Sequence, residues 1–155
     1  MANSIFKLKD GRDYDYLANN VESKSAILFH HGTPGDCTVW SSWVSGLSTV
    51  RAIAASRPGY GLSSRRRGRN VASDIDNNSE LLDHFGIEKF VSIGWSGGGP
   101  HALNMTRHPK NVGAITLAGV GLAAIKAPYV FAKTKTTLRV MGTHVTLQEE
   151  IREKA

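Results

Sequence analysis

Short apolar runs alternate along this chain with segments in which apolar residues recur at helical spacing. The apolar runs of strand length lie at residues 25–31, 50–55, 90–95 and 112–120. The segments with helical periodicity lie at residues 39–47, 71–85 and 100–108. Before them, residues 7–14 contain Asp10-Gly11, a preferred two-residue turn between paired strands. This order predicts an α/β fold, in which an N-terminal hairpin leads into a mostly parallel sheet with helices on both faces.

Two of the helical segments carry more specific signals. In residues 39–47, the spacing places Trp40, Trp43, Val44 and Leu47 on one helical face. The segment 71–85 is followed by Gly86, which suits a helix C-cap. We therefore expect the first helix to pack through its tryptophans and the second to end at the glycine.

Composition limits the class of protein. The 155 residues suffice for one domain, and 41% hydrophobic with 21% charged residues is an ordinary soluble composition. No apolar run approaches the ~20 residues of a membrane span, and the N-terminus lacks a basic region followed by a long apolar segment. The single cysteine, Cys37, excludes an internal disulfide and fits a reducing compartment. We expect a cytoplasmic protein in which Cys37 has no catalytic role.

The net charge of +6 is concentrated in Arg65-Arg66-Arg67-Gly68-Arg69, four arginines in five residues. Such a run binds nucleic acid or a phosphate-rich surface in some proteins, and in others it is a solvated loop before a helix. No aromatic residue interleaves with it, so a stacking platform for single strands is not indicated. We favour the solvated loop and expect no nucleic-acid partner.

The strongest chemical signal is Gly94-Trp95-Ser96-Gly97-Gly98, which lies between an expected strand and an expected helix. Gly-x-Ser-x-Gly in this setting is the pattern of a nucleophile elbow. The turn is so tight that small residues must flank the serine, and it lifts the hydroxyl out of the sheet edge. Ser96 is therefore the candidate nucleophile.

Two further motifs follow expected strands, namely His30-His31-Gly32-Thr33-Pro34-Gly35 and Ser56-Arg57-Pro58-Gly59-Tyr60-Gly61-Leu62-Ser63. Together with the elbow they resemble the serine-nucleophile members of the α/β-hydrolase family, from about Ile5 to Gly121. The resemblance implies hydrolysis of an ester, amide or related acyl bond in a small-molecule substrate through an acyl-serine, without a metal or cofactor. It also implies that the Thr33 and Gly97 amides form the oxyanion hole. A serine at the elbow argues against the dehalogenase and epoxide-hydrolase branches, whose nucleophile is an aspartate.

The histidines up to residue 108 are not expected to act as the catalytic base. In the family the base follows the serine and the acid in the chain. We expect His31 to support the oxyanion loop by hydrogen bonding and His101 to be a packing or capping residue. His30 is expected within a strand, and a metal site is not indicated because the ligands are not clustered.

The acid and the base of the triad are not convincingly present. No Asp or Glu occurs between Lys89 and Gln148, and the only later histidine, His144, precedes Glu149, Glu150 and Glu153. Thr146 to Glu149 match a capping box, which predicts a short terminal helix. We therefore expect residues 1–121 to form the N-terminal part of an α/β-hydrolase core without the later strands and lid. Residues 122–155 are expected to be a basic and apolar tail.

Three functional hypotheses follow from this pattern. The chain is an incomplete serine hydrolase with weak or no activity, a compact hydrolase in which His144 serves as base, or a non-catalytic binding module on the same scaffold. In the last case Arg65 to Arg69 would be the most obvious binding surface. An unfinished sheet would also leave an edge strand exposed, so we expect self-association through it.

Overall fold

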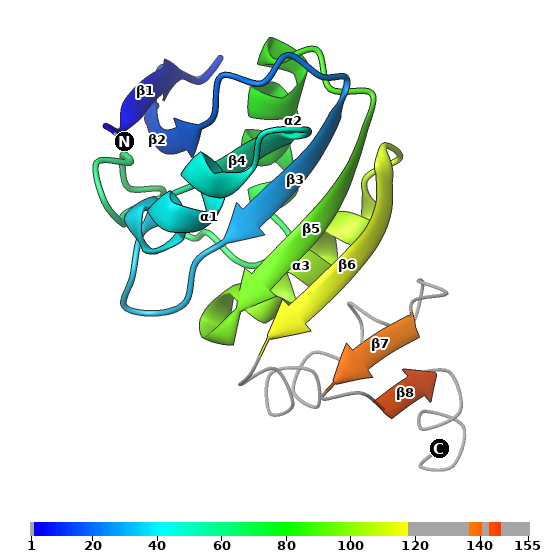
Figure 1. The fold of residues 1–155 in the computed structure, drawn as a ribbon. Helices are drawn as coiled ribbons and strands as arrows, with labels where there is room; N and C mark the ends of the chain where they lie inside the picture. Colours follow the sequence, from blue (N-terminus) through cyan, green and yellow to red (C-terminus); the bar gives the residue numbers. More distant parts are fainter. Residues whose placement is uncertain (1, 118–136, 141–142, 147–155) are drawn as a thin grey trace.

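The computed structural model describes residues 2–117, 137–140 and 143–146, and its strands and helices follow one another along the chain in the predicted alternation (Figure 1). The strands are β1 (Ser4–Lys7), β2 (Asp13–Ala18), β3 (Ser25–His30), β4 (Arg51–Ala55), β5 (Lys89–Trp95), β6 (Asn111–Leu117), β7 (Thr137–Val140) and β8 (Thr143–Thr146). The α-helices are α1 (Ser41–Gly46), α2 (Asp74–His84) and α3 (Gly99–Asn104). Short 3-10 helices are η1 (Cys37–Trp40), η2 (Ser96–Gly98) and η3 (Met105–Arg107).

Six strands form one mixed sheet in the order β1-β2-β4-β3-β5-β6. β1 and β2 are antiparallel, as are β2 and β4, whereas β4, β3, β5 and β6 run parallel. This confirms the predicted class: an N-terminal hairpin leading into a largely parallel sheet. β7 and β8 pair with each other as a separate antiparallel pair.

The hairpin differs from prediction in its loop. Pairing ends at Lys7 opposite Asp13, so five residues rather than two connect the strands. Leu8 is buried in the core, and its amide donates to the carbonyl of Arg12 across the loop at 2.9 Å. Gly11, at φ 84°, makes the reversal. The connection between β1 and β2 is therefore longer than the two-residue turn that Asp10-Gly11 predicted.

Helices cover both faces of the sheet, with α1 on one face and α2 and α3 on the other (Figure 1). Each face has its own core because successive side chains of a strand point to opposite sides. Leu28 of β3 belongs to the cluster that contains Leu81 and Leu82 of α2. The next residue, Phe29, belongs to the cluster that contains Val44 of α1. Alternation along β3 therefore divides the core between the two helical layers.

The first predicted helix consists of the 3-10 helix η1 followed by α1. One residue of its expected buried face is exposed to solvent. Trp40 and Val44 are buried, but Trp43 is 59% exposed. Adjacent residues are ~100° apart around a helix, so with Val44 directed at the sheet its neighbour Trp43 lies at the margin of that face. Trp43 instead packs edge-on against Trp40, with ring centres 6.2 Å apart.

Residues at the ends of the other helices account for where these helices begin or end. α2 has Asp74 and Asp76 in its first turn, where carboxylates complement the helix dipole. Its predicted glycine terminus is confirmed: Gly86 has φ 64° and the Ile87 amide donates to Leu82 O at 3.0 Å. The helical segment after Ser96 ends at Arg107, before Pro109. None of the helices in the described ranges has the length and apolar character of a membrane span.

The parallel strands direct the three sequence motifs to one edge of the sheet. His30, the last residue of β3, pairs with Ala55 at the end of β4 and with Gly94 near the end of β5. Loops at the carboxyl ends of such strands are where ligands bind in open α/β sheets. The expected terminal helix after Thr146 lies outside the described residues, as do residues 118–120 of the last predicted strand.

Candidate active site

Ser96 stands at the turn from β5 into η2, in a backbone conformation that L-residues rarely adopt. Its φ is 50°, and among the described residues it is the only non-glycine with positive φ. Such a residue is strained and persists only where its surroundings hold it, which is typical of functional turns. The side chain is half-buried at the carboxyl edge of the sheet. The hydroxyl is therefore displayed at the edge where the other two motifs converge.

The two glycines flanking this turn have no room for a side chain. A Cβ on Gly98 would lie 2.1 Å from the carbonyl oxygen of His30, and one on Gly94 would lie 2.4 Å from that of Gly98. Both obstacles are backbone atoms, which cannot rotate away. Gly98 is thus required by the contact with the end of β3, and Gly94 by the tightness of the turn itself.

The loop after β3 is packed directly against the serine turn. A Cβ on Gly32 would lie 3.2 Å from Ser96 Cβ, and one on Gly97 would lie 3.3 Å from the Thr33 backbone nitrogen. Within residues 2–117 the Thr33 amide donates to no protein acceptor. The structure therefore brings together the three residues that the sequence nominated, Ser96, Thr33 and Gly97.

His31 is held in one tautomer by two hydrogen bonds. The Arg57 backbone N–H donates to its Nε2 at 3.0 Å, so Nε2 carries no proton and Nδ1–H donates to Gly32 O at 2.7 Å. The ring is fully buried, and burial together with the nearby Arg57 charge lowers the pKa of His31 to about 4. A neutral imidazole with both nitrogens engaged supports the loop and is not available as a base.

Arg57 fixes the same loop from the opposite side. Its buried guanidinium donates to the carbonyl oxygens of His31 and Gly32 and to Thr33 Oγ1, the last at 3.1 Å. Its Cζ also lies 5.0 Å from the ring centre of Tyr60. Burial lowers the pKa of Arg57 from its ordinary value. One charged side chain thus satisfies three oxygens of the loop that approaches Ser96.

A model of the α/β-hydrolase fold matches residues 25–141, which include the elbow and the Thr33 loop. The chain belongs to the α/β-hydrolase family. An uncharacterized hydrolase of Bacillus subtilis, YcgS, is 33% identical over 111 residues, which are 70% of this chain and 38% of the relative. The chain therefore spans well under half the length of this relative.

Solved structures agree on the α/β-hydrolase fold. A hydrolase from Pseudomonas aeruginosa superposes with a TM-score of 0.64 at 18% identity, over 86% of this chain and 54% of that one. An esterase from Exiguobacterium antarcticum superposes with a TM-score of 0.62 at 19% identity, over 74% of this chain and 44% of the esterase. At such identities the similarity establishes the fold and leaves the reaction to be argued from the site.

His101 of α3 lies beside a buried carboxylate of α2 in this α/β hydrolase. Its Nδ1 lies 2.6 Å from Oδ2 of Asp74 at the start of α2, and both side chains are buried. Burial lowers the pKa of His101 although Asp74 opposes the shift. His101 is therefore buried, as expected of a packing residue, and it also pairs with Asp74 across α2 and α3.

No base for Ser96 is found among the described side chains of this α/β hydrolase. Within residues 2–117, no imidazole is hydrogen-bonded to the Ser96 hydroxyl. His144 lies in β8 opposite Arg139 of β7, and its side chain is outside the described atoms. Its assignment as a possible base stays a prediction.

Sequence reasoning missed Arg57 and the Asp74–His101 pair. Arg57 was visible only as part of a family motif, and its contacts depend on the parallel pairing of β3 with β4. Asp74 had the signal of a first-turn carboxylate, which is ordinarily solvated. Its burial beside His101 depends on how α2 and α3 pack, and local spacing does not contain that information.

Proposed function

We propose that Ser96 is the nucleophile of a serine hydrolase that cleaves an ester, amide or related acyl bond. Its Oγ attacks the carbonyl carbon, the carbonyl oxygen becomes an oxyanion, and the leaving group departs with a proton to give an acyl-serine. Water then attacks the acyl carbon and releases the acid and the free serine. The Thr33 and Gly97 amides are the proposed donors to the oxyanion, and each such donor typically contributes ~3 kcal/mol.

The observation that carries this proposal is the φ of 50° at Ser96 between two glycines that admit no Cβ. A turn that tight positions one hydroxyl next to the chain-reversing loop of Thr33. His31 and Arg57 hold that loop from both sides through its carbonyl oxygens. The donors are therefore positioned before substrate arrives, which is the condition for oxyanion stabilisation.

We further propose that this chain reacts slowly on its own. A serine without a base is a weak nucleophile at neutral pH, and an oxyanion hole alone leaves ~10³–10⁴-fold acceleration over water. Between Lys89 and Gln148 the sequence has no carboxylate to orient a histidine. We attribute this low reactivity to the lack of a described base and acid at Ser96, and not to the proposed nucleophile or oxyanion donors.

A fluorophosphonate probe tests the nucleophile directly, because it forms a covalent bond with an activated serine. We expect slow labelling of the parent chain over hours at neutral pH, confined to Ser96 on peptide mapping and absent in Ser96→Ala. Ser42→Ala, which removes an exposed hydroxyl of α1, is the matched control and should label as the parent does. The measurement is probe incorporation against time by intact-mass spectrometry.

Two outcomes would contradict this account. Labelling at another serine, unchanged in Ser96→Ala, would remove Ser96 as the nucleophile. Labelling within minutes that is lost in both Ser96→Ala and His144→Ala would instead establish a complete compact hydrolase with His144 as its base.

A further inference from the structure

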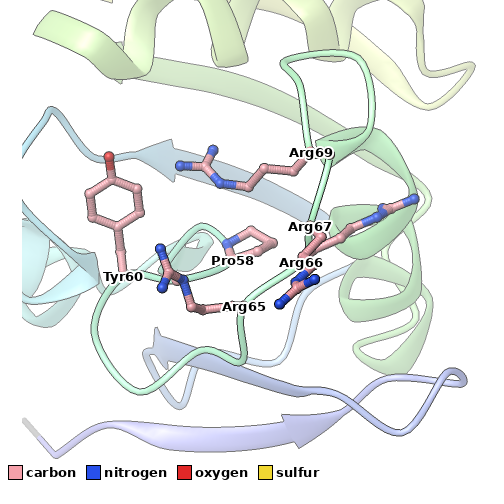
Figure 2. A pocket seen from close by; sticks show the side chains of 8 residues that line it. Pro58, Tyr60, Arg65, Arg66, Arg67 and Arg69 are labelled. Atoms are coloured by element: carbon pink, nitrogen blue, oxygen red, sulfur yellow. The ribbon is translucent and has the colours of Figure 1, made fainter.

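The loop between β4 and α2 surrounds a cavity of about 710 Å³ that is partly open to solvent. Its lining comes entirely from this loop: Pro58, Gly59, Tyr60, Arg65, Arg66, Arg67, Gly68 and Arg69. Figure 2 shows the side chains of Arg65 and Arg69 converging on Tyr60 from the two arms of the loop. The arginine run is exposed at Arg65 and Arg67, as expected of a solvated loop, and it also lines this hollow.

Hydrogen bonds to β2 fix the shape of the first arm of this loop. The Asp15 amide donates to Ser63 Oγ at 2.9 Å, and that hydroxyl donates to Ser56 O at 2.7 Å. The Leu62 amide donates to the buried Asp15 carboxylate at 3.1 Å, and the Ser64 amide donates to Asp13 O at 2.9 Å. Three of these bonds join the loop to β2, so residues 62–64, which directly precede the arginines, are held in place without a ligand.

The positive charge of the cavity is largely uncompensated. Arg66 donates to Ser73 O at 3.2 Å and lies 3.9 Å from the exposed Asp76 carboxylate. Within residues 2–117, no carboxylate lies within 4.0 Å of the guanidinium nitrogens of Arg65, Arg67 or Arg69. A bound anion would compensate these charges.

Tyr60 organises the inner wall of the cavity. The Arg69 Cζ lies 5.3 Å from the Tyr60 ring centre and the Arg57 Cζ lies 5.0 Å from it. The same ring meets His31 edge-on at 5.1 Å between ring centres. Cation–π contact therefore orients the Arg69 guanidinium, and one aromatic ring separates this cavity from the loop that approaches Ser96.

We propose that this cavity binds the phosphate or pyrophosphate group of a small molecule. Planar guanidinium forks match the paired oxygens of phosphate, and several of them suit a multiply charged group better than a single carboxylate. The volume falls within the range of about 300–1,000 Å³ for small-molecule sites. A nucleic-acid strand would instead need a basic track with interleaved aromatics, and this lining has one aromatic residue.

The site is tested with inorganic pyrophosphate as the probe, by isothermal titration calorimetry on the whole chain at low and moderate salt. We expect one-to-one binding with a Kd of tens to hundreds of micromolar, weakened about 10-fold or more in Arg65→Gln/Arg69→Gln. Lys9→Gln/Arg107→Gln removes two exposed charges elsewhere and is the control, which should weaken binding less than about 2-fold. Equal weakening in both double variants, or no binding at millimolar pyrophosphate, would overturn the proposal.

Protection from arginine modification gives a second readout that needs no variant to fold. Pyrophosphate should slow phenylglyoxal modification of Arg65 and Arg69 and leave that of Arg107 unchanged, as measured by peptide mass spectrometry. Protection of all three to the same extent would indicate general screening and would contradict a defined site. Neither readout involves Ser96, so this proposal stands or fails independently of the hydrolase proposal.

The source of the phosphate is distinguished by two further probes. The first probe is a pair of phosphatidylcholine vesicles, one with and one without phosphatidic acid. If the ligand is a lipid headgroup, the chain should sediment only with the vesicles that contain phosphatidic acid, and only when Arg65 and Arg69 are intact. Binding of pyrophosphate without vesicle binding supports a free phosphorylated ligand. A single-stranded oligonucleotide that binds more tightly than pyrophosphate and needs the same arginines would contradict the small-molecule site.

Discussion

Gly98→Ala is expected to lower the free energy of unfolding by roughly 4 kcal/mol or more, enough to abolish a cooperative transition in a marginally stable domain. The new Cβ would lie 2.1 Å from the carbonyl oxygen of His30 and 2.7 Å from that of His31. Both are backbone atoms at the carboxyl end of β3, so relief requires β3 and the Ser96 turn to separate. Overpacking against backbone exceeds the ~1–3 kcal/mol typical of an extra methyl among side chains.

The matched substitution is Gly46→Ala at the end of α1. Nothing lies within 4 Å of a Cβ built there, and its backbone does not have positive φ. We expect a change within ~0.5 kcal/mol, because the substitution only restricts the unfolded chain. Urea denaturation followed by circular dichroism compares the two variants. Equal midpoints would show that the elbow does not contact β3 as closely as the structure has it.

The glycines around Ser96 show what the sequence could predict and why. Their spacing around Ser96 is local, and a turn between a strand and a helix needs small residues whatever the rest of the fold does. The helix terminus at Gly86 was predictable for the same reason, since positive φ at a C-cap is a property of one residue. The alternation of strands and helices likewise follows from short-range periodicity.

Contacts that depend on which elements become neighbours were not predictable. Arg57 reaches the Thr33 loop because β4 pairs with β3, and Asp74 meets His101 because α2 lies beside α3. The same holds for the arginine run. Its charge is evident in the sequence, but the loop that carries it is anchored to β2 by hydrogen bonds between residues 47 and 48 positions apart. The number of charges indicates that the loop is solvated, but its shape depends on tertiary contacts that the local sequence does not reveal.

Stability should fall as pH is lowered from about 6.5 to 4, and His31 should account for a large part of the loss. Its folded-state pKa is about 4, whereas an unperturbed histidine in the unfolded chain titrates near 6.5. Between these values the unfolded chain binds a proton that the folded chain does not. Proton uptake therefore favours unfolding, and the contribution of His31 is complete above pH 6.5 and lost at pH 4.

The difference between the two pKa values corresponds to roughly 3 kcal/mol for His31. Burial also lowers the pKa values of His30 and His101, so these residues act in the same direction. The contribution of His31 is isolated by comparison: in His31→Gln the loss of unfolding free energy between pH 7 and pH 4 should be smaller by about 3 kcal/mol.

His84→Gln provides the control for this comparison, because His84 is exposed at the end of α2. Its unfolding free energy should depend on pH as that of the parent chain does, measured by urea denaturation at each pH. Protonation of His31 removes the acceptor of the Arg57 amide at Nε2, so the same titration should loosen the Thr33 loop. If the His31→Gln and parent curves are parallel between pH 7 and pH 4, the buried neutral imidazole does not hold that loop.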